Sequence, residues 1–258
     1  MPVQSRRQQL AIITPVHASH VSFLPDIWAS IANQILPYGW SIRWHVREDG
    51  PPSNCRAFLE SLADARIDYS ASSECGGAAE ARNLALARVD SDFVCIRDAD
   101  DILVEGSLAR TIEMIVAGSG WVGANALDGP TNLKPRSTGY SARLDAQMQM
   151  PSSAVPFSAA TWLGKMEFGR VRQCWEIHAV IPFHPATWTT RTDYLWEVGG
   201  WPGLARDEDT ACILAVTDRH DGWVLEEPAI VYRHHQFQTS RLRRPMSERI
   251  EFIRRSQR

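Results

Sequence analysis

Long apolar runs are absent from this 258-residue sequence. No stretch approaches the roughly 18–20 apolar residues that a membrane-spanning helix requires. Residues 1–9 are polar and lack the apolar segment of a secretory signal. The sequence therefore predicts neither a membrane span nor a secreted protein.

Cysteine is scarce, and no C-x-x-C pair or zinc-type spacing occurs. The five cysteines are scattered and odd in number, which favours reduced thiols over a disulfide framework or a structural zinc site. Together with the missing signal, this pattern predicts a cytoplasmic protein.

A global excess of positive charge is also absent, because the net charge is -3. We therefore expect no nucleic-acid partner. Arginines nevertheless crowd residues 241–258, which makes this basic tail a candidate for peripheral contact with acidic lipid. A solvated amphipathic helix end explains the same pattern, so both interpretations remain open. The arginines that define the tail are Arg241, Arg243, Arg244, Arg249, Arg254 and Arg255.

Apolar residues make up 44% of the chain, enough for a sizeable core. Strand and helix patterns alternate through the first 125 residues, as in a parallel, doubly wound α/β sheet. The predicted strands are 10–14, 41–47, 67–71, 93–97 and 121–126, and the predicted helices are 24–36, 58–65, 78–88 and 105–117. Residues 127–156 read as an irregular insertion. Beyond it we expect helices over 161–168, 193–198 and 207–216 and strands over 188–191, 224–225 and 229–233.

Three carboxylates follow the apolar run that begins at Phe93: Asp98, Asp100 and Asp101, with only Ala99 among them. Acids packed this closely repel one another unless a cation lies between them. Oxygen ligands suit Mg²⁺ or Mn²⁺, which commonly take further ligands from substrate phosphates. The cluster predicts a metal–diphosphate site, and a solvated acidic turn is the alternative.

Polar residues end two further predicted strands, at Thr14-Pro15 and at Glu48-Asp49-Gly50. Ligands of such sheets lie beyond the carboxyl ends of the strands. We therefore expect these two ends and the acid cluster to converge on one site.

Further motifs occur in a fixed order along the chain. They are Ile13-Thr14-Pro15-Val16, Glu48-Asp49-Gly50, Gly76-Gly77-Ala78-Ala79-Glu80-Ala81-Arg82-Asn83, Asp98-Ala99-Asp100-Asp101, Gly199-Gly200-Trp201, Glu208-Asp209 and Tyr232-Arg233-His234-His235. This order resembles the family 2 glycosyltransferases of the GT-A fold, in which the acid cluster corresponds to the DxD motif. The resemblance extends over about residues 10–240.

The resemblance implies a division of the chain. Residues 1–125 would form the nucleotide-sugar-binding half, residues 126–240 the acceptor-binding and catalytic-base half of the same domain, and residues 241–258 a basic tail. It also implies the nucleotide-binding residues Thr14, Pro15, Asp49, Arg82, Asn83 and Asp98.

A metal site is implied as well, with Mn²⁺ or Mg²⁺ held by Asp100, Asp98 and His235. His234 is the alternative to its neighbour, and Asp101 would support the metal or contact the sugar. The other histidines show no metal-type spacing and read as structural; of these, His184 suits the acceptor side best.

Catalysis by the family needs a base facing the sugar from the side opposite the leaving diphosphate. Asp209 is the predicted base, with Glu208 in reserve, and attack from this side inverts the anomeric configuration. The resemblance places Asp101, Trp201, Gln238 and Thr239 among the donor or acceptor contacts. For Trp201 and Trp188, core packing is the alternative to sugar stacking.

These features predict a metal-dependent, inverting transferase that uses a nucleoside diphosphate sugar, with UDP favoured. The acceptor, which is a small molecule, a lipid-linked glycan or a protein, is left open, as is a homodimer. The long membrane-attachment region of the polysaccharide synthases is missing, which argues against a processive, membrane-embedded synthase. Two alternatives remain: a sugar-nucleotidyltransferase, although Pro15-Val-His-Ala-Ser replaces its Gly-rich loop, and a catalytically silent nucleotide-sugar binding protein.

Overall fold

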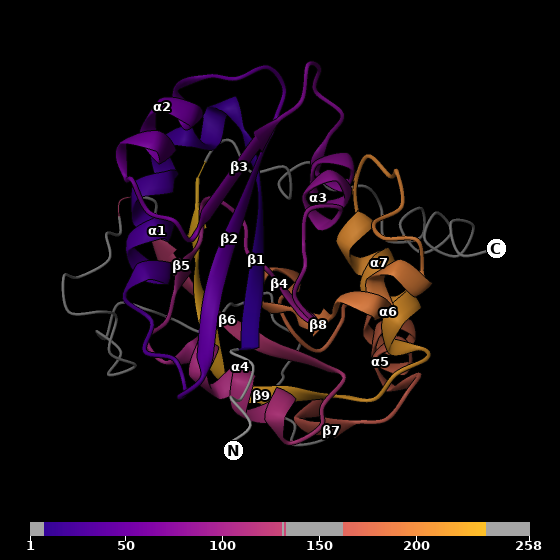
Figure 1. The fold of residues 1–258 in the computed structure, drawn as a ribbon. Coiled ribbons are helices and arrows are strands. Elements are labelled where there is room, and N and C mark those ends of the chain that lie inside the picture. The colour runs from indigo at the N-terminus through magenta and orange to yellow at the C-terminus, as the bar shows by residue number, and fades with distance from the viewer. Residues whose placement is uncertain (1–7, 131, 133–161, 236–258) are drawn as a thin grey trace.

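A computed structural model describes residues 8–130, 132 and 162–235 (Figure 1). Within these residues the strands are β1 (Gln8–His17), β2 (Trp40–Asp49), β3 (Ile67–Ala71), β4 (Phe93–Ile96), β5 (Ile102–Leu103), β6 (Trp121–Pro130), β7 (Gly164–Met166), β8 (Thr189–Arg191) and β9 (Gly222–His234). The α-helices are α1 (Leu24–Ala32), α2 (Asn54–Ser61), α3 (Ala78–Leu86), α4 (Ser107–Val116), α5 (Arg170–His178), α6 (Thr192–Glu197) and α7 (Glu208–Thr217). Two 3-10 helices are η1 (Ala18–Phe23) and η3 (Pro185–Thr187).

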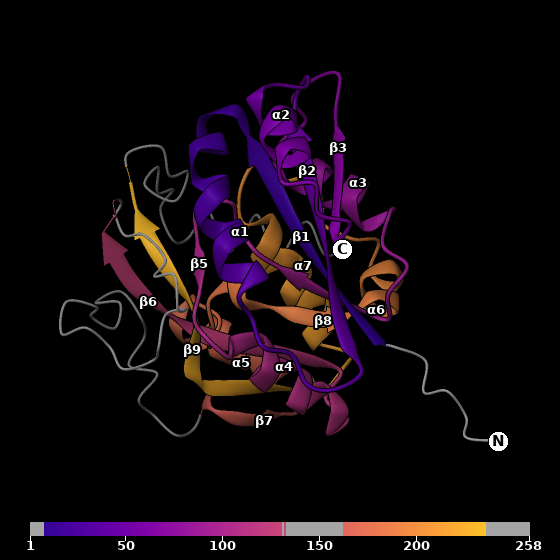
Figure 2. The same cartoon turned by 60° about the vertical axis from the view of Figure 1, so that its left-hand side comes forward.

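The described strands form one nine-stranded sheet in the order β3-β2-β1-β4-β8-β6-β9-β5, with β7 paired to β9. Strands β3, β2, β1 and β4 are parallel neighbours, as the sequence predicts. Strand β8 is antiparallel to both β4 and β6, while β6 and β9 run side by side in parallel (Figure 2). The predicted α/β class is confirmed, but the described sheet is mixed, with four parallel and four antiparallel strand pairings, and it continues unbroken into its second half.

Alternation along β1 explains why helices cover both faces of the sheet. Leu10 and Ile12 pack into one core, with apolar residues of α1, α2 and α4. Ala11 and Ile13 pack into the other, with residues of α3, α5, α6 and α7. Figure 1 shows α1 and α2 on one side of the sheet and α3, α6 and α7 on the other. A strand that is buried on both faces reads as a continuous apolar run, which the sequence of β1 has.

The predicted helix over 161–168 is wrong within residues 162–168. Strand β7 lies there instead, because it completes an edge pairing with β9. Helix α5 follows it and was not predicted. Its buried residues Val171, Cys174 and Trp175 have the i, i+3, i+4 spacing that would have revealed it.

Other boundaries also differ from prediction. Strand β9 is continuous over Gly222–His234, where two short strands over 224–225 and 229–233 were predicted. Helix α2 begins earlier than expected because the Ser53 side chain caps it, accepting a hydrogen bond from the Cys55 N–H. Strand β6 extends to Pro130, into the region predicted to be irregular. Among the described residues, no helix is long and apolar enough to cross a membrane.

Candidate active site

The carboxyl ends of three neighbouring strands meet at one edge of the sheet. Parallel pairing sets His17 opposite Asp49 between β1 and β2, and Ile13 opposite Ile96 between β1 and β4. The acid cluster follows β4 directly. The predicted convergence of the three polar strand ends therefore follows from the register of the central strands.

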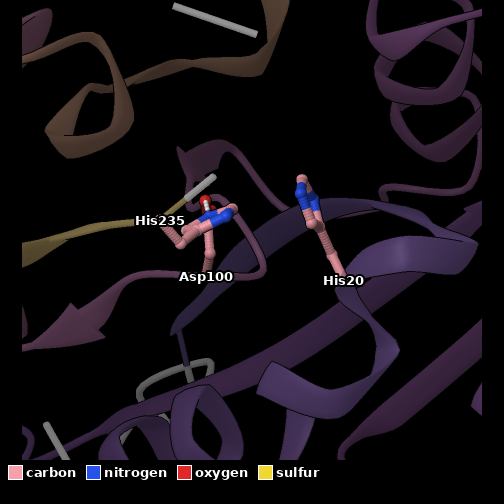
Figure 3. Close-up of side chains that lie close together, drawn as sticks. All are labelled: His20, Asp100 and His235. Atoms are coloured by element: carbon pink, nitrogen blue, oxygen red, sulfur yellow. Dashed lines mark hydrogen bonds and ion pairs between the residues drawn. The ribbon is translucent and has the colours of Figure 1, made fainter. Parts of the chain in front are cut away.

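His20, Asp100 and His235 come together above this edge (Figure 3). One ligand atom from each side chain lies within 4.8 Å of the others. His235 Nε2 is 2.6 Å from Asp100 Oδ2, whereas the His20 ring lies edge-on to His235, with the ring centroids 5.2 Å apart. Two imidazoles and a carboxylate suit Mn²⁺ or another borderline divalent ion.

Burial lowers the pKa of His20, although the nearby Asp100 carboxylate opposes this effect. Burial alone would raise the pKa of Asp100, but its hydrogen bond to His235 and the nearby His20 and His235 rings together outweigh this, and the pKa is lowered. At pH 7 the first group is therefore a neutral imidazole and the second a carboxylate. These are the protonation states that bind a divalent metal.

Asp101 lies deeper than Asp100 and is fully buried. Neither of its carboxyl oxygens has a hydrogen-bond partner within the described part of the chain. Burial raises its pKa well above the usual value, and the Asp100 and Asp98 carboxylates add to this effect. Crowding of like charge is thus most severe at Asp101, as expected from three acids packed together.

Arg233 supports the cluster of His20, Asp100 and His235, called the metal-type cluster below, by holding the backbone of Asp100. Its Nε donates to the Asp100 backbone oxygen at 2.5 Å, and its Nη1 lies 2.6 Å from Asp26 Oδ2. These bonds fix the backbone that carries Asp100 and place the end of β9, with His235, against it.

Arg82 joins the two halves of the site. From α3 its buried guanidinium donates to Asp98 Oδ1 at 3.0 Å and to Glu208 Oε1 at 2.7 Å. Burial opposes the charge of Arg82, but the Asp98 and Glu208 carboxylates outweigh this effect and raise its pKa. A single side chain therefore ties the acid cluster to the N-terminus of α7.

Asp209 occupies the first turn of α7 and is partly exposed. Burial and the Glu208 carboxylate together raise its pKa to about 7, although Arg82 opposes both. Its Oδ1 accepts a hydrogen bond from the Thr210 N–H at 2.6 Å. A pKa near neutrality suits a general base, whereas Glu208 is engaged by Arg82.

The predicted nucleotide residues differ in their partners. Asp49 Oδ1 accepts the backbone N–H groups of Gly76 and Gly77 at 2.7 and 3.2 Å, which ties β2 to the start of α3. The buried Thr14 hydroxyl accepts the indole N–H of Trp44 at 2.8 Å.

Both polar atoms of the Asn83 side chain are bonded to the backbone of Trp201. Its Nδ2 donates to the Trp201 carbonyl and its Oδ1 accepts the Trp201 N–H, both at 2.8 Å. The rings of Trp201 and Trp188 are only 2% and 1% exposed. The structure thus places both rings in the core, the alternative to sugar stacking.

The sequence model of glycosyl transferase family 2 matches residues 11–182, more than half of the chain. The chain belongs to glycosyl transferase family 2. No curated protein sequence gives a significant match to it.

Solved structures similar to this family 2 chain include TarS residues 1–349 from S. aureus in complex with UDP-GlcNAc, at 15% identity and a TM-score of 0.71. The alignment covers 96% of this chain and 66% of TarS 1–349. Mannosyltransferase PcManGT from Pyrobaculum calidifontis, in complex with GDP-Man and Mn²⁺, aligns at 15% identity and a TM-score of 0.57. That alignment covers 91% of this chain and 59% of PcManGT, so the chain spans less than two thirds of either protein. These likenesses establish the GT-A fold.

The metal-type cluster of this family 2 chain contains one residue that the sequence did not single out. His20 lies 80 positions from Asp100 and 215 from His235, so no spacing links the three. Of the two neighbouring candidates in the late motif, His235 contacts Asp100, whereas His234 pairs with Asp128 at 2.8 Å. Gln238, Thr239 and the basic tail lie outside the described residues.

His184, the acceptor-side candidate, caps η3 by accepting the Ala186 N–H. Its ring lies 4.8 Å from that of Tyr232. Burial lowers its pKa, which Asp98 and Asp100 oppose, so His184 is close enough to the acid cluster to feel its charge.

Proposed function

We propose that this chain transfers a sugar from a nucleoside diphosphate donor to an acceptor nucleophile, with a divalent metal and with inversion at the anomeric carbon. The observation that carries the proposal is the bridge made by Arg82. Because Arg82 bonds both Asp98 and Glu208, the acid cluster and the candidate base Asp209 belong to one site. Membership of family 2 supports the same activity.

The donor set fits Mn²⁺ or Mg²⁺. Asp100 and His235 would hold the ion with His20, whose Nε2 has no hydrogen-bond partner within the described residues. Asp98 and Asp101 flank Asp100 in the acid cluster. When bound, the metal stabilises the negative charge of the departing diphosphate as a Lewis acid.

The side chains of this chain would perform the remaining steps. Asp209 accepts the proton of the attacking acceptor hydroxyl at its carboxylate, so the oxygen becomes nucleophilic as it approaches the anomeric carbon. Glu208 is the less suitable base because its carboxylate already accepts a hydrogen bond from Arg82. Attack on the face opposite the leaving diphosphate inverts the configuration.

For the donor we propose a UDP-sugar, with Asp49 as the residue that would recognise the uracil imide. Its carboxylate already accepts two backbone N–H groups, so it is held rigidly and retains acceptor capacity. The solved neighbours carry UDP-GlcNAc and GDP-Man, and a GDP-sugar is therefore the alternative. The acceptor is an unidentified hydroxyl compound, lipid-linked glycan or protein.

Calorimetric titration with UDP, GDP and dTDP, each with Mn²⁺ and with EDTA, tests this function. We expect one nucleotide to bind tightly only when the metal is present. Absence of metal-dependent binding to all three would contradict the proposed site. Metal-dependent hydrolysis of the donor then separates a transferase from a silent nucleotide-sugar binding protein.

Replacing His20 by phenylalanine should weaken Mn²⁺ binding by about 10- to 100-fold, because the ring is kept and the ligand nitrogen is lost. Electron paramagnetic resonance of free Mn²⁺ during titration measures this directly. His17→Asn is the matched control, since His17 lies on the same segment and is exposed. Equal Mn²⁺ affinity in both variants would remove His20 from the proposed ligand set.

A further inference from the structure

The first turn of α7 carries the candidate base, whereas the acid cluster follows β4, a different element. A base acts only when it is held within a fraction of an ångström of the productive position. Contacts that hold α7 against the donor side would therefore set the position of the candidate base. Two consecutive residues of α3, Arg82 and Asn83, provide such contacts.

Asn83 binds the turn Gly199–Gly200–Trp201, which lies between α6 and α7. Its amide forms two hydrogen bonds with the backbone of a single residue, accepting from the Trp201 N–H and donating to the Trp201 carbonyl, each at 2.8 Å. This two-point contact resembles the pairing of adjacent strands, and it leaves Trp201 little freedom to rotate or slide. Asn83 is only partly exposed, so water competes poorly for these bonds.

The turn is built for this close approach. Gly200 has a φ of +75°, and a Cβ placed there would collide with Oδ1 of Asn83. Gly199 has a similar φ of +79°, but a Cβ there would meet nothing within 4 Å. Both positions need glycine for their backbone conformation, and only Gly200 also needs it for contact with Asn83.

The clamped residue is anchored in the core that α3 shares with α7. The Trp201 ring is 2% exposed and belongs to the same apolar cluster as Ala79 and Ala85 of α3 and Ala211 and Cys212 of α7. A displacement of the turn would therefore disturb the packing of α7. The Arg82 bond to Glu208 acts on the same helix end from the neighbouring position.

We propose that Asn83 is a positioning residue, which sets the candidate base Asp209 against the donor site by clamping the Gly200–Trp201 turn to α3. This inference rests on the proposed function of Asp209. It replaces the nucleotide-binding role that the sequence suggested for Asn83. No contact of the Asn83 side chain with the nucleotide is required.

The first test compares Asn83→Ala with wild type, using release of nucleoside diphosphate from UDP-GlcNAc or GDP-mannose as the turnover assay. We expect kcat to fall about 10- to 100-fold. The Kd for UDP or GDP with Mn²⁺ should change less than about threefold. The acid limb of the kcat profile should move to lower pH, since a loosened helix end exposes Asp209 to water.

The second test uses the two glycines as a matched pair. Gly199→Ala and Gly200→Ala introduce the same methyl group at similar backbone conformations, so their strain is comparable. Gly200→Ala should reduce kcat markedly more, because it alone displaces Asn83. In the double variant Asn83→Ala/Gly200→Ala the two losses should not add. Should Asn83→Ala fail to fold, this pair carries the test.

Hydrogen exchange provides a readout that does not depend on turnover. Loss of the clamp should accelerate exchange in residues 200–212 and leave β1 and β2 protected. Faster exchange with unchanged kcat and pH profile would refute positioning by Asn83 while leaving the proposed function intact. Weaker nucleotide binding with unchanged kcat would restore the nucleotide role. Full turnover in Asp209→Asn would instead refute the base assignment itself.

Discussion

Replacing Asp209 by asparagine is expected to lower sugar transfer by about 10²- to 10⁴-fold, which is the usual contribution of a general base. Asparagine keeps the oxygen that accepts the Thr210 N–H but cannot take a proton. Metal-dependent nucleotide binding should be unchanged, because Asp209 is not part of the cluster of His20, Asp100 and His235. Product formation and calorimetry on the same preparation separate the two effects.

The pH dependence of the wild-type enzyme should follow the same carboxyl group. Its pKa is raised to about 7, so the fraction in the basic form, and with it kcat, should fall as the pH decreases through about 7. An acid limb centred near pH 4 would show that a group with an ordinary carboxyl pKa acts as the base.

Stability should change in the opposite direction to activity. A carboxyl whose pKa is raised on folding binds its proton more tightly in the folded state, so stability is lost as the pH rises from the unfolded pKa of about 4 through the folded pKa of about 7. The Asp209→Asn variant escapes this penalty. At pH 8 its free energy of unfolding should exceed that of the wild type by about 1–2 kcal/mol. The difference should vanish below about pH 3, where the carboxyl is protonated in both the folded and the unfolded state.

Asp207→Asn is the control for both measurements. Asp207 caps the same helix at a φ of 59°, a left-handed conformation that asparagine also adopts. This variant should retain transfer and gain no pH-dependent stability. If it behaves like Asp209→Asn, the general charge of the helix end, and not one base, explains the effect.

Replacing Asp100 by alanine should weaken metal-dependent nucleotide binding by at least about 100-fold. Asp100 is the only carboxylate in the described cluster with the two histidines, so its loss removes the single anionic ligand. The backbone oxygen that accepts the Arg233 hydrogen bond is retained, which should preserve the local chain path. Calorimetry with Mn²⁺ and UDP or GDP measures the loss.

The chain offers a close control in Asp128→Asn. Asp128 pairs with His234 at 2.8 Å, one residue from the pair that Asp100 makes with His235 at 2.6 Å. Both pairs join an aspartate to a histidine at the end of β9, but only the second belongs to the metal-type cluster. Equal nucleotide affinity in the two variants would show that Asp100 is not the ligand assigned here.

Much of the fold could be predicted from local pattern. Short apolar runs predict the buried strands β1 and β4, and apolar residues at i, i+3 and i+4 spacing predict helix α4. The local pattern did not reveal β7, and the apolar spacing of α5 was present but was not recognised as a helix. Strand β7 is three residues long and exists through its pairing with β9, a contact between distant segments that leaves no periodic signature.

The late histidine motif could be located in the sequence, where the resemblance favoured His235 over His234, but no physical argument from the sequence separated the two. Consecutive residues of a strand point to opposite faces. His234 and His235 at the end of β9 therefore meet different partners, and the pairing of β9 in the sheet selects which one reaches Asp100. Neither residue type nor spacing carries that information.

The sequence by itself determined the α/β class, the acid cluster after β4 and the acids that begin α7, because each is a local pattern of charge and hydrophobicity. Only the tertiary structure decided that His20 joins Asp100, that Arg82 bridges Asp98 to Glu208, and that Asn83 holds Trp201. The physical reason is the same in each case. These contacts join residues from 16 to 126 positions apart, and strand order and helix packing, not chain proximity, bring their side chains together.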